Sequence, residues 1–432
     1  MKRNLSLLIS LSIWATGISG DISLNDAYSI LTVRAGKTPR SESRSGIKGR
    51  VFCGYQGWFR APGDGSDLGF HHYEKNGKFE PGHCTIDLWP DLSEFDEDEK
   101  YPTAFRHKDG SVANVFSSLN PKTVNRHFRW MKEYDIDGAF VQRFATQAKG
   151  DSKSFDLLKA DNQKLINCRE AANLNNRAYA LMYDLSGLTD DDFEDLARDW
   201  KNLRTLMKLG NDPNDPAYLQ FAGKPLVAIW GVGFSGDDRK YTLESAEKFI
   251  RLLKHNPEWG GMSVMLGVPY YWREQTRDAT GHPGFHQVLQ LADIISPWSV
   301  GRYHDTSKGA VQIVSIQAED LKWCQQKDIE YLPVLYPGFS WKNLHGGELN
   351  AIPRRGGKFL WDQFIATKAA GNQSAYIAMF DEIDEATAIF KCTNQPPVGK
   401  SEFLTYENLP NDHYLWLCRE GRRLLNDQLP GR

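Results

Sequence analysis

The sequence has few cysteines, little net charge and no long hydrophobic run, and each of these absences narrows the classes of protein to consider. Six cysteines in 432 residues do not suggest a disulfide framework, because a chain of this length builds a sufficient core without bridges. A net charge of −3 provides no basic surface for nucleic acid or an anionic membrane. No CxxC pair occurs, which argues against a structural zinc site. No segment after the amino terminus approaches about 18 uninterrupted apolar residues, so we predict no membrane span in the mature protein.

The amino terminus has the features of a secretory signal peptide. A basic head, Met1-Lys2-Arg3, precedes a largely apolar stretch over residues 5–14 that is too short to span a bilayer. Ile18-Ser19-Gly20 then places small residues at a spacing that signal peptidase accepts. We predict a cleaved signal peptide over residues 1–20, a polar lead-in over 21–48 that is partly disordered in its Ser/Arg-rich part, and a secreted or periplasmic protein. In such a compartment one or two disulfides are possible, and Cys392 with Cys418 is one candidate pair.

From about residue 49, short β-branched or aromatic runs alternate with longer amphipathic ones, which favours βαβ units. The predicted strands cover residues 50–54, 138–142, 178–183, 225–230, 263–268, 293–296, 330–335 and 375–380. The predicted helices cover residues 121–134, 155–173, 190–209, 243–254, 284–291, 309–326, 358–370 and 414–425. A doubly wound sheet would carry a glycine-rich phosphate turn after its first strand, and "GYQGWF" is not one. We therefore predict an α/β fold in which residues 49–432 form a single (β/α)8 TIM-type barrel with a long first βα loop, from about residue 60 to 120.

Polar and aromatic residues follow most of the predicted strands, where (β/α)8 barrels place their active sites. These strand-end residues are Tyr55, Gln56, Trp58, Gln142, Arg143, Asp184, Trp230, Tyr271, Trp272, Trp298, Tyr336, Asp381, Glu382 and Glu385. Aromatic rings and carboxylates at one mouth suit a saccharide cleft, and the chain is rich in Trp, Tyr and Phe. Two alternatives stay open: Trp58, Trp272 and Trp298 are either sugar platforms or rim packing. Arg143 either pairs with the carboxylates or braces the barrel.

Glu382 and Glu385 are the candidate catalytic pair. If the chain turns helical after Phe380, these two residues share a helix face with Cβ atoms roughly 5–6 Å apart. A carboxyl separation of about 5–5.5 Å is typical of retaining glycosidases. Crowding by Asp381 and Asp384 should raise at least one carboxyl pKa, as a general acid requires. The alternative is an ordinary acidic helix start, with Asp381 as the cap.

The segment "MFDEIDEAT" resembles the Asn-Glu-Trp-His-Glu-Gly-Thr signature of glycoside hydrolase family 99, the endo-α-mannosidases and endomannanases. The whole mature chain resembles bacterial family 71/99-like proteins, through "GYQGWF", "ALMYDL", "GKPLVAIW", "LPVLYPGF" and the order of elements. Only the Glu-x-x-Glu motif is specific. The resemblance implies a retaining hydrolase without metal or cofactor. It assigns Glu382 as base on the sugar 2-hydroxyl, Glu385 as general acid and then base, and, more weakly, Asp184 as a substrate-orienting carboxylate.

The motif departs from the family pattern at four positions that shape the sugar subsite. Asp381, Ile383, Asp384 and Ala386 stand where the family has Asn, Trp, His and Gly. The sugar recognised therefore need not be mannose.

Our first hypothesis is a secreted retaining glycoside hydrolase that acts on an α-linked, mannan-like glycan or polysaccharide. The alternatives are a non-catalytic carbohydrate-binding barrel and an exo-acting xylosidase or arabinosidase. His71, His72, His83 and Cys84 match no zinc-site spacing, so we predict no metal. The sequence leaves the sugar, the linkage and the oligomeric state open.

Overall fold

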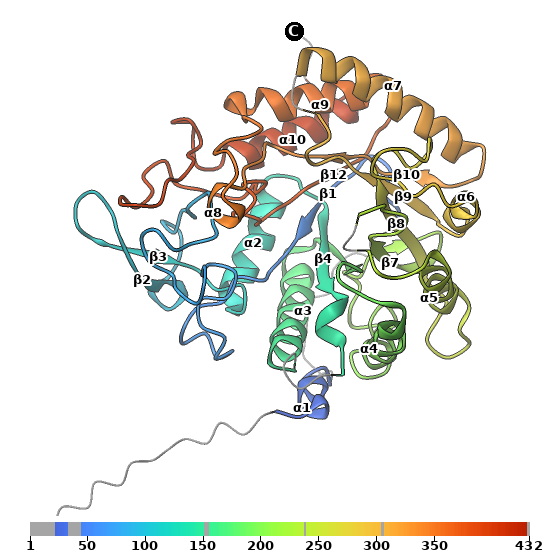
Figure 1. Ribbon diagram of the computed structural model, residues 1–432, viewed down its shortest axis with the longest axis horizontal. Helices are drawn as coiled ribbons and strands as arrows, with labels where there is room; N and C mark the ends of the chain where they lie inside the picture. Colours follow the sequence, from blue (N-terminus) through green and yellow to red (C-terminus); the bar gives the residue numbers. More distant parts are fainter. Residues whose placement is uncertain (1–21, 33–44, 151–154, 237–238, 304–305, 430–432) are drawn as a thin grey trace, which may run out of the picture.

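Eight parallel strand positions close around one axis, as the computed structural model of the protein shows for residues 22–32, 45–150, 155–236, 239–303 and 306–429 (Figure 1). The predicted signal peptide lies outside these described residues. The barrel strands are β1 (Val51–Tyr55), β4 (Gly138–Phe144), β5 (Ala178–Asp184), β7 (Lys224–Trp230), β8 (Ser263–Pro269), β9 (Ile294–Trp298), the pair β10 (Glu330–Tyr331) and β11 (Val334–Leu335), and β12 (Ala375–Ile377). The predicted (β/α)8 fold class is confirmed.

The barrel closes through its seventh strand position, which consists of two short pieces. β10 pairs with β9, and β11 pairs with β12, both in parallel. Between them, the Leu332 N–H donates to Ile295 O (2.9 Å), and Pro333 O accepts from Tyr376 N (2.9 Å). Pro333 has no N–H to donate to a ladder, which explains why the strand predicted over residues 330–335 is split.

Helices surround the sheet, one after most barrel strands, as the sequence pattern predicts (Figure 1). They are α2 (Pro121–Glu133), α3 (Phe155–Asn175), α4 (Phe193–Thr205), α5 (Leu243–His255), α6 (Phe285–Leu289), α7 (Thr306–Gln325), α9 (Lys358–Ala369) and α10 (His413–Leu425). Helix α2 shows how local sequence sets a boundary: the Asn120 side chain accepts from Lys122 N, and Pro121 occupies the first turn, where its missing N–H costs nothing. Short elements complete the chain: η2 (Ala145–Ala148), η4 (Asp190–Asp192), β6 (Gln220–Phe221), α8 (Lys342–His345) and η5 (Arg355–Gly357). Within the described residues, no helix is long and apolar enough to cross a bilayer.

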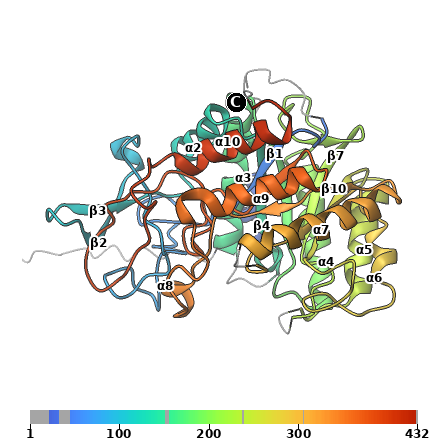
Figure 2. The same cartoon turned by 90° about the horizontal axis from the view of Figure 1, so that it is seen from above.

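The long first βα loop is a folded subdomain rather than an irregular lid. It contains η1 (Glu97–Glu99) and a hairpin of β2 (Tyr101–Arg106) and β3 (Val112–Val115), which lies on the side of the barrel away from α5 and α6 (Figure 2). Its own aromatic core includes Trp89 and Phe105, whose ring centroids are 5.1 Å apart. The acidic run at residues 94–99, by itself more typical of a solvated surface, is partly structural, because Glu99 is fully buried and pairs with Arg126.

The polar lead-in contains a helix that the sequence pattern did not reveal. Helix α1 (Leu24–Ser29) is capped by Ser23 and packs on α3. Its Tyr28 hydroxyl donates to Asp199 Oδ1 (2.7 Å), deep between the sheet and the helices. All six cysteines are free and buried, so the candidate Cys392–Cys418 disulfide is not formed.

The sheet separates two hydrophobic cores, and strand alternation decides which residue enters which core. The inner core contains Phe52, Phe140 and Tyr376, whose rings are in contact at 5.6 and 5.7 Å. Gly54 is required there because a Cβ atom would lie 2.2 Å from the Tyr376 hydroxyl. The outer core, between sheet and helices, takes the alternate residues, such as Cys53 and Val141.

Candidate active site

The inward-facing row of strand residues continues to the carboxyl-terminal mouth of the barrel. Gln142, Asp184 and Trp230 lie on the same strand faces as the inner-core residues Phe140, Met182 and Ala228. Asp184 and Trp230 are register partners, so they lie side by side. The Trp298 ring meets the Trp230 ring edge-on at 5.5 Å. These residues form one wall of the candidate site.

The segment after β12 is a tight turn rather than the helix that the sequence analysis considered. Residues 383–386 form a turn, and Ala386 has a positive φ of 51°. The Glu382 carbonyl accepts from Thr387 N (3.1 Å) and Ala388 N (3.0 Å), which closes the turn. The helical spacing argument for Glu382 and Glu385 is therefore wrong, and so is the helix-cap alternative for Asp381. The turn brings both glutamates to the same mouth by another route.

Asp381 anchors this turn to the end of β1. Its two carboxylate oxygens accept from the backbone N–H groups of Gln56 and Gly57, both at 2.8 Å. Burial raises the pKa of Asp381 to about 6, and the two backbone donors oppose that increase. Asp381 therefore fixes where the first and last barrel strands meet.

Glu382 is buried and held by neutral donors. The Gln56 side-chain amide donates to Glu382 Oε1 (2.7 Å), and the Thr387 hydroxyl donates to Oε2 (2.5 Å). Burial raises the pKa of Glu382 well above its ordinary value, and the nearby carboxylates of Glu385 and Asp384 raise it further. The two hydrogen bonds act in the opposite direction, because they favour the ionised form.

Glu385 is half-buried, whereas Glu382 is buried. Burial raises its pKa to about 8, and the charge of Asp384 adds to this increase. A hydrogen bond from the Trp341 side chain lowers the pKa in part. A carboxyl group with a pKa near 8 is protonated at neutral pH, which is the state a general acid needs.

Asp384 lies beside the two glutamates and faces a stacked pair of rings. Its Oδ2 atom is 3.7 Å from His72 Nδ1, and the His72 ring stacks on Trp58 with centroids 4.0 Å apart and planes at 5°. Burial lowers the pKa of His72 to about 3, so this imidazole is neutral. Burial also raises the pKa of Asp384 to about 7. Three neighbouring carboxyl groups thus share this mouth, without a cation against Glu382 or Glu385 among their described contacts.

Several buried polar atoms at the mouth have no hydrogen-bond partner among the described protein groups. They are Gln56 Oε1, Trp58 Nε1, Gln142 Oε1, Trp230 Nε1 and Asp384 Oδ1. Buried donors and acceptors are normally satisfied in folded proteins, and each exception needs an explanation. Two indole donors and three carbonyl-type acceptors around one cluster of carboxyl groups suit a ligand rich in hydroxyl groups.

Other predicted site residues face away from the mouth. Arg143 points to the outer side of the barrel, where it binds Asp199 and Asp161, so its contacts are those of a brace rather than a partner of Glu382 or Glu385. Strand alternation is the reason: Gln142 faces inward, so its neighbour Arg143 must face outward. The Tyr55 side chain also lies on the outer side of the barrel, where its hydroxyl oxygen is 3.0 Å from His127 Nδ1.

Three aromatic residues predicted at the site are packed into the protein. Trp272 is fully buried and donates through Nε1 to Asp320 (3.2 Å), which is the rim-packing alternative. The Tyr336 hydroxyl donates to Tyr303 O (2.8 Å). Tyr271 is buried under the Arg277 guanidinium, which lies 4.2 Å from its ring centroid. The prediction that these three side chains line the sugar site is therefore not supported by their contacts, which lie within the packed protein.

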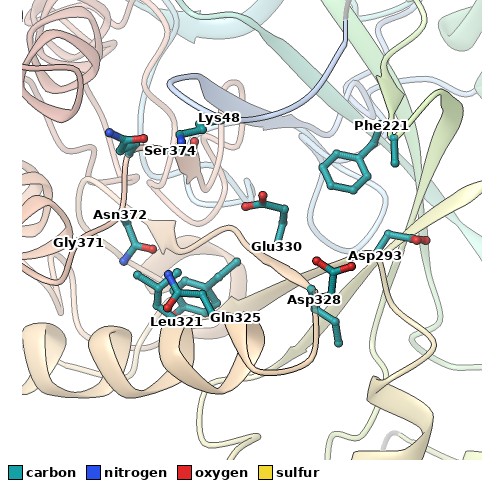
Figure 3. A pocket seen from close by; sticks show the side chains of 14 residues that line it. Lys48, Phe221, Asp293, Leu321, Gln325, Asp328, Glu330, Gly371, Asn372 and Ser374 are labelled. Carbon is teal, nitrogen blue, oxygen red and sulfur yellow. The ribbon is translucent and has the colours of Figure 1, made fainter.

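A separate cavity of about 550 Å³ lies at the opposite, amino-terminal end of the barrel (Figure 3). Asp293, Glu330 and Ser374 line it near the starts of β9, β10 and β12. Asp293 is already engaged, because it accepts from Lys254 Nζ (2.6 Å) and Val264 N (2.7 Å). (β/α)8 enzymes use the other end of the barrel for chemistry, so the carboxyl cluster remains the candidate active site.

Comparisons with known proteins agree with this architecture. No protein-family model and no curated protein matches the chain. Among solved structures, the GH99 endo-α-mannosidase from Bacteroides thetaiotaomicron matches with a TM-score of 0.62 and 14% identity, over 89% of this chain and 99% of that chain. The chain has the fold of a family 99 glycoside hydrolase. A second structure of the Bacteroides enzyme, in complex with Bis-Tris propane, matches with a TM-score of 0.60 and 15% identity, over 88% of this chain and 98% of that chain. A glycoside hydrolase-like protein matches with a TM-score of 0.51 and 12% identity, over 93% of this chain and 99% of that chain.

Three residues that the strand-end argument did not predict lie at the carboxyl cluster. Thr387 had a signal, because it matches the last residue of the family motif, and its hydroxyl binds Glu382. His72 was considered only as a metal ligand, and Trp341 was not predicted as a site residue. Both lie in loops whose paths depend on tertiary packing, so no local pattern in the sequence identifies them.

Proposed function

We propose that the protein is a retaining glycoside hydrolase that acts on an α-linked glycan or polysaccharide, with a mannan-like substrate favoured. The observation that carries this proposal is the pair of buried carboxyl groups, Glu382 and Glu385, at the barrel mouth with neutral hydrogen-bond donors. Buried donors and acceptors without a partner lie at the same mouth. The resemblance of the motif to family 99 and the shared fold support the same reaction class.

In the first proposed step, Glu382 removes the proton from the sugar 2-hydroxyl, and O2 forms a bond to C1. The glycosidic C1–O bond breaks at the same time, and Glu385 gives its proton to the departing oxygen. In the second step a water molecule attacks C1 and the C1–O2 bond breaks, while Glu385 takes the proton of that water and Glu382 returns its proton to O2. Two displacements at C1 retain the anomeric configuration.

This assignment requires one proton on the pair of glutamates. Burial raises the pKa of both glutamates, and the donors at both oxygens of Glu382 oppose that increase, so we assign the remaining proton to Glu385. Two interacting carboxyl groups lose their protons in separate steps. We therefore expect a bell-shaped pH profile, whose basic limb lies near pH 8 because the free enzyme loses the Glu385 proton there.

The test is hydrolysis by Glu382→Gln and Glu385→Gln variants, measured on an activated aryl α-glycoside and on a panel of mannan-type oligosaccharides. Both variants should lose activity on oligosaccharides by about 10²–10⁴-fold, the contribution of positioned acid–base groups. Glu385→Gln should retain more activity on the activated glycoside, whose leaving group needs less protonation. Glu258→Gln, at an exposed glutamate after α5, is the matched control. Full activity in both active-site variants contradicts the proposal.

A non-catalytic carbohydrate-binding barrel is the second candidate, and the four altered motif positions favour it. It predicts glycan binding without a product, so a glycan array beside the hydrolysis assay separates the two. Product sizes from a defined oligosaccharide distinguish an endo enzyme from an exo-acting xylosidase or arabinosidase. Export to the periplasm or the medium remains part of the proposal, on the basis of residues 1–20.

A further inference from the structure

We propose that Trp341 forms the leaving-group side of the cleft, where its indole N–H holds the Glu385 carboxyl group and its exposed ring stacks on the departing sugar. This inference rests on the proposed function, because it identifies the binding surface for one part of the substrate. The contact between the Trp341 N–H and the Glu385 carboxyl group does not depend on a bound substrate.

The first observation is that Trp341 combines exposure with a hydrogen bond to a buried acid. Its side chain is 40% exposed, whereas tryptophans such as Trp89, Trp130 and Trp200 are fully buried. The indole nitrogen is the only donor of a Trp side chain, and it faces Glu385, whose pKa it lowers. One edge of the ring therefore meets the reacting carboxyl group while part of the ring remains open to solvent.

The second observation is that the Trp341 segment and the motif turn are joined to each other. The Ser340 N–H donates to the Glu385 carbonyl (2.9 Å). On the other side of Trp341, the buried Asp87 carboxylate accepts from Lys342 N and Asn343 N, both at 2.9 Å. The Asp87 N–H in turn donates to Ile383 O (2.9 Å). These bonds fix the Trp341 backbone relative to Glu385.

The ring itself is oriented by two neighbours. Phe339 packs against it at a centroid distance of 5.1 Å, and His345 meets it edge-on at 4.7 Å. An exposed aromatic face held in one orientation loses little conformational freedom when a ligand stacks on it. Trp341 thus has the properties of a preformed platform.

The proposed general-acid role of Glu385 indicates which sugar would stack on Trp341. A general acid must lie within hydrogen-bond reach of the glycosidic oxygen that it protonates. The sugar bonded to that oxygen as leaving group therefore lies next to Glu385, and on the deep side Glu382 is enclosed by Gln56 and Thr387. The open ring beside Glu385 is that of Trp341. Its N–H also favours the ionised form of Glu385, which helps the acid release its proton.

The experiment compares Trp341→Phe and Trp341→Ala on two substrates with the same glycosyl group. One is an unactivated mannan-type oligosaccharide, and the other is the corresponding α-glycosyl fluoride, whose leaving group occupies no sugar subsite. Trp341→Phe keeps a ring but loses the donor, so KM should stay within about twofold while the basic limb of the pH profile moves to higher pH. Trp341→Ala should in addition raise KM for the oligosaccharide about tenfold, the effect of one lost aromatic contact, and leave KM for the fluoride unchanged.

Trp416→Ala is the matched control, because Trp416 is 41% exposed and lies on α10. It should change neither KM nor the pH profile. An equal KM change for both substrates in Trp341→Ala, or no change for either, contradicts the proposal that Trp341 binds the leaving-group sugar.

A second measurement separates this inference from the proposed function. Titration of the carboxyl groups by ¹³C NMR, with the Glu385 signal identified through Glu385→Gln, should show a higher Glu385 pKa in Trp341→Phe than in the wild type. An unchanged titration overturns the hydrogen-bonding role even if the enzyme is active. If the pKa moves but no glycoside is cleaved by the wild type, the proposed function fails while the contact between Trp341 and Glu385 stands.

Discussion

At the scale of single residues, the four carboxyl groups of the segment 381–385 have different environments because their hydrogen-bond partners differ. Asp381 receives two backbone N–H groups and holds two barrel strands together. Glu382 receives two neutral side-chain donors, and Glu385 receives one indole. Asp384 retains an unpaired, buried Oδ1 atom. Division of roles between neighbouring carboxyl groups by their surroundings is a common basis of acid–base catalysis.

The neighbours Gln142 and Arg143 should respond in opposite ways to the same substitution. Arg143→Met leaves Asp199 and Asp161 buried without their guanidinium, so we expect a loss of about 3–5 kcal/mol in the free energy of unfolding. Gln142→Met removes an unpaired amide from the mouth, so stability should stay within about 1 kcal/mol while activity falls. Urea unfolding and hydrolysis rates measure the two effects. Equal destabilisation by both variants would contradict the inward and outward placement.

At the scale of elements, the last barrel strand is shorter than its apolar run. Residues 378–380 were predicted as strand, but β12 ends at Ile377, and the Phe380 N–H donates to Gly54 O (2.8 Å). Phe380 then packs against the rings of His127 and Phe390. The apolar run correctly indicated burial, whereas departure from the ladder follows from the turn that Asp381 anchors. This departure is what places Glu382 and Glu385 over the mouth.

Two long-range hydrogen bonds join helix α1 to the surrounding helices: Tyr28 OH donates to Asp199, and Asn162 Nδ2 donates to Ala27 O (2.8 Å). Tyr28→Phe removes the donor to the fully buried Asp199, so we expect a loss of about 1–3 kcal/mol in the free energy of unfolding. Ser29→Ala, on the same six-residue helix but exposed, is the control and should stay within about 0.5 kcal/mol. Chemical denaturation gives both values. If the two variants are equally stable, the hydrogen bond from Tyr28 to Asp199 does not contribute to stability.

At the scale of the whole molecule, the two hydrophobic cores stabilise the fold, whereas ionisation of the buried carboxyl cluster destabilises it. The two hydrophobic cores lie on either side of the sheet, and the carboxyl cluster lies where the inner core ends. Burial raises the pKa of every carboxyl group in the cluster, so the folded protein favours their neutral forms. Such a group stabilises the fold at low pH, and this contribution disappears as pH rises through its folded-state pKa.

The thermal stability of Glu385→Gln should therefore depend on pH relative to the wild type. Because the Glu385 pKa is raised to about 8, the cost of ionising this group grows from about pH 4.5 and is fully present above pH 8. The variant should match the wild-type Tm at pH 5 and exceed it at pH 9, with on the order of 1–2 °C for each kcal/mol removed. Calorimetry at both pH values tests this. Glu258→Gln, at an exposed site, should show no such difference, and a variant that is less stable at pH 9 would contradict the prediction.

The strands and helices of the fold could be predicted from the sequence because the features that specify them act over short stretches of chain. Strand alternation, helical amphipathicity and Pro121 each act within a few residues, and they placed the barrel strands and most helices close to their observed bounds. The motif at residues 379–387 identified the two glutamates, although the helical geometry expected for them was wrong. Helix α1 was missed because its six residues carry too short a pattern.

The amino-acid sequence by itself determined which segments become strands and helices, and which carboxyl groups gather after the last strand. Only the tertiary structure decided that Gln142 faces the mouth while Arg143 does not, because the face of a strand depends on the register of its neighbours. It alone brought His72 and Trp341, more than two hundred and fifty residues apart, to the same carboxyl cluster. Contacts of this kind arise from the closure of the barrel and the packing of its loops, which no short stretch of sequence encodes.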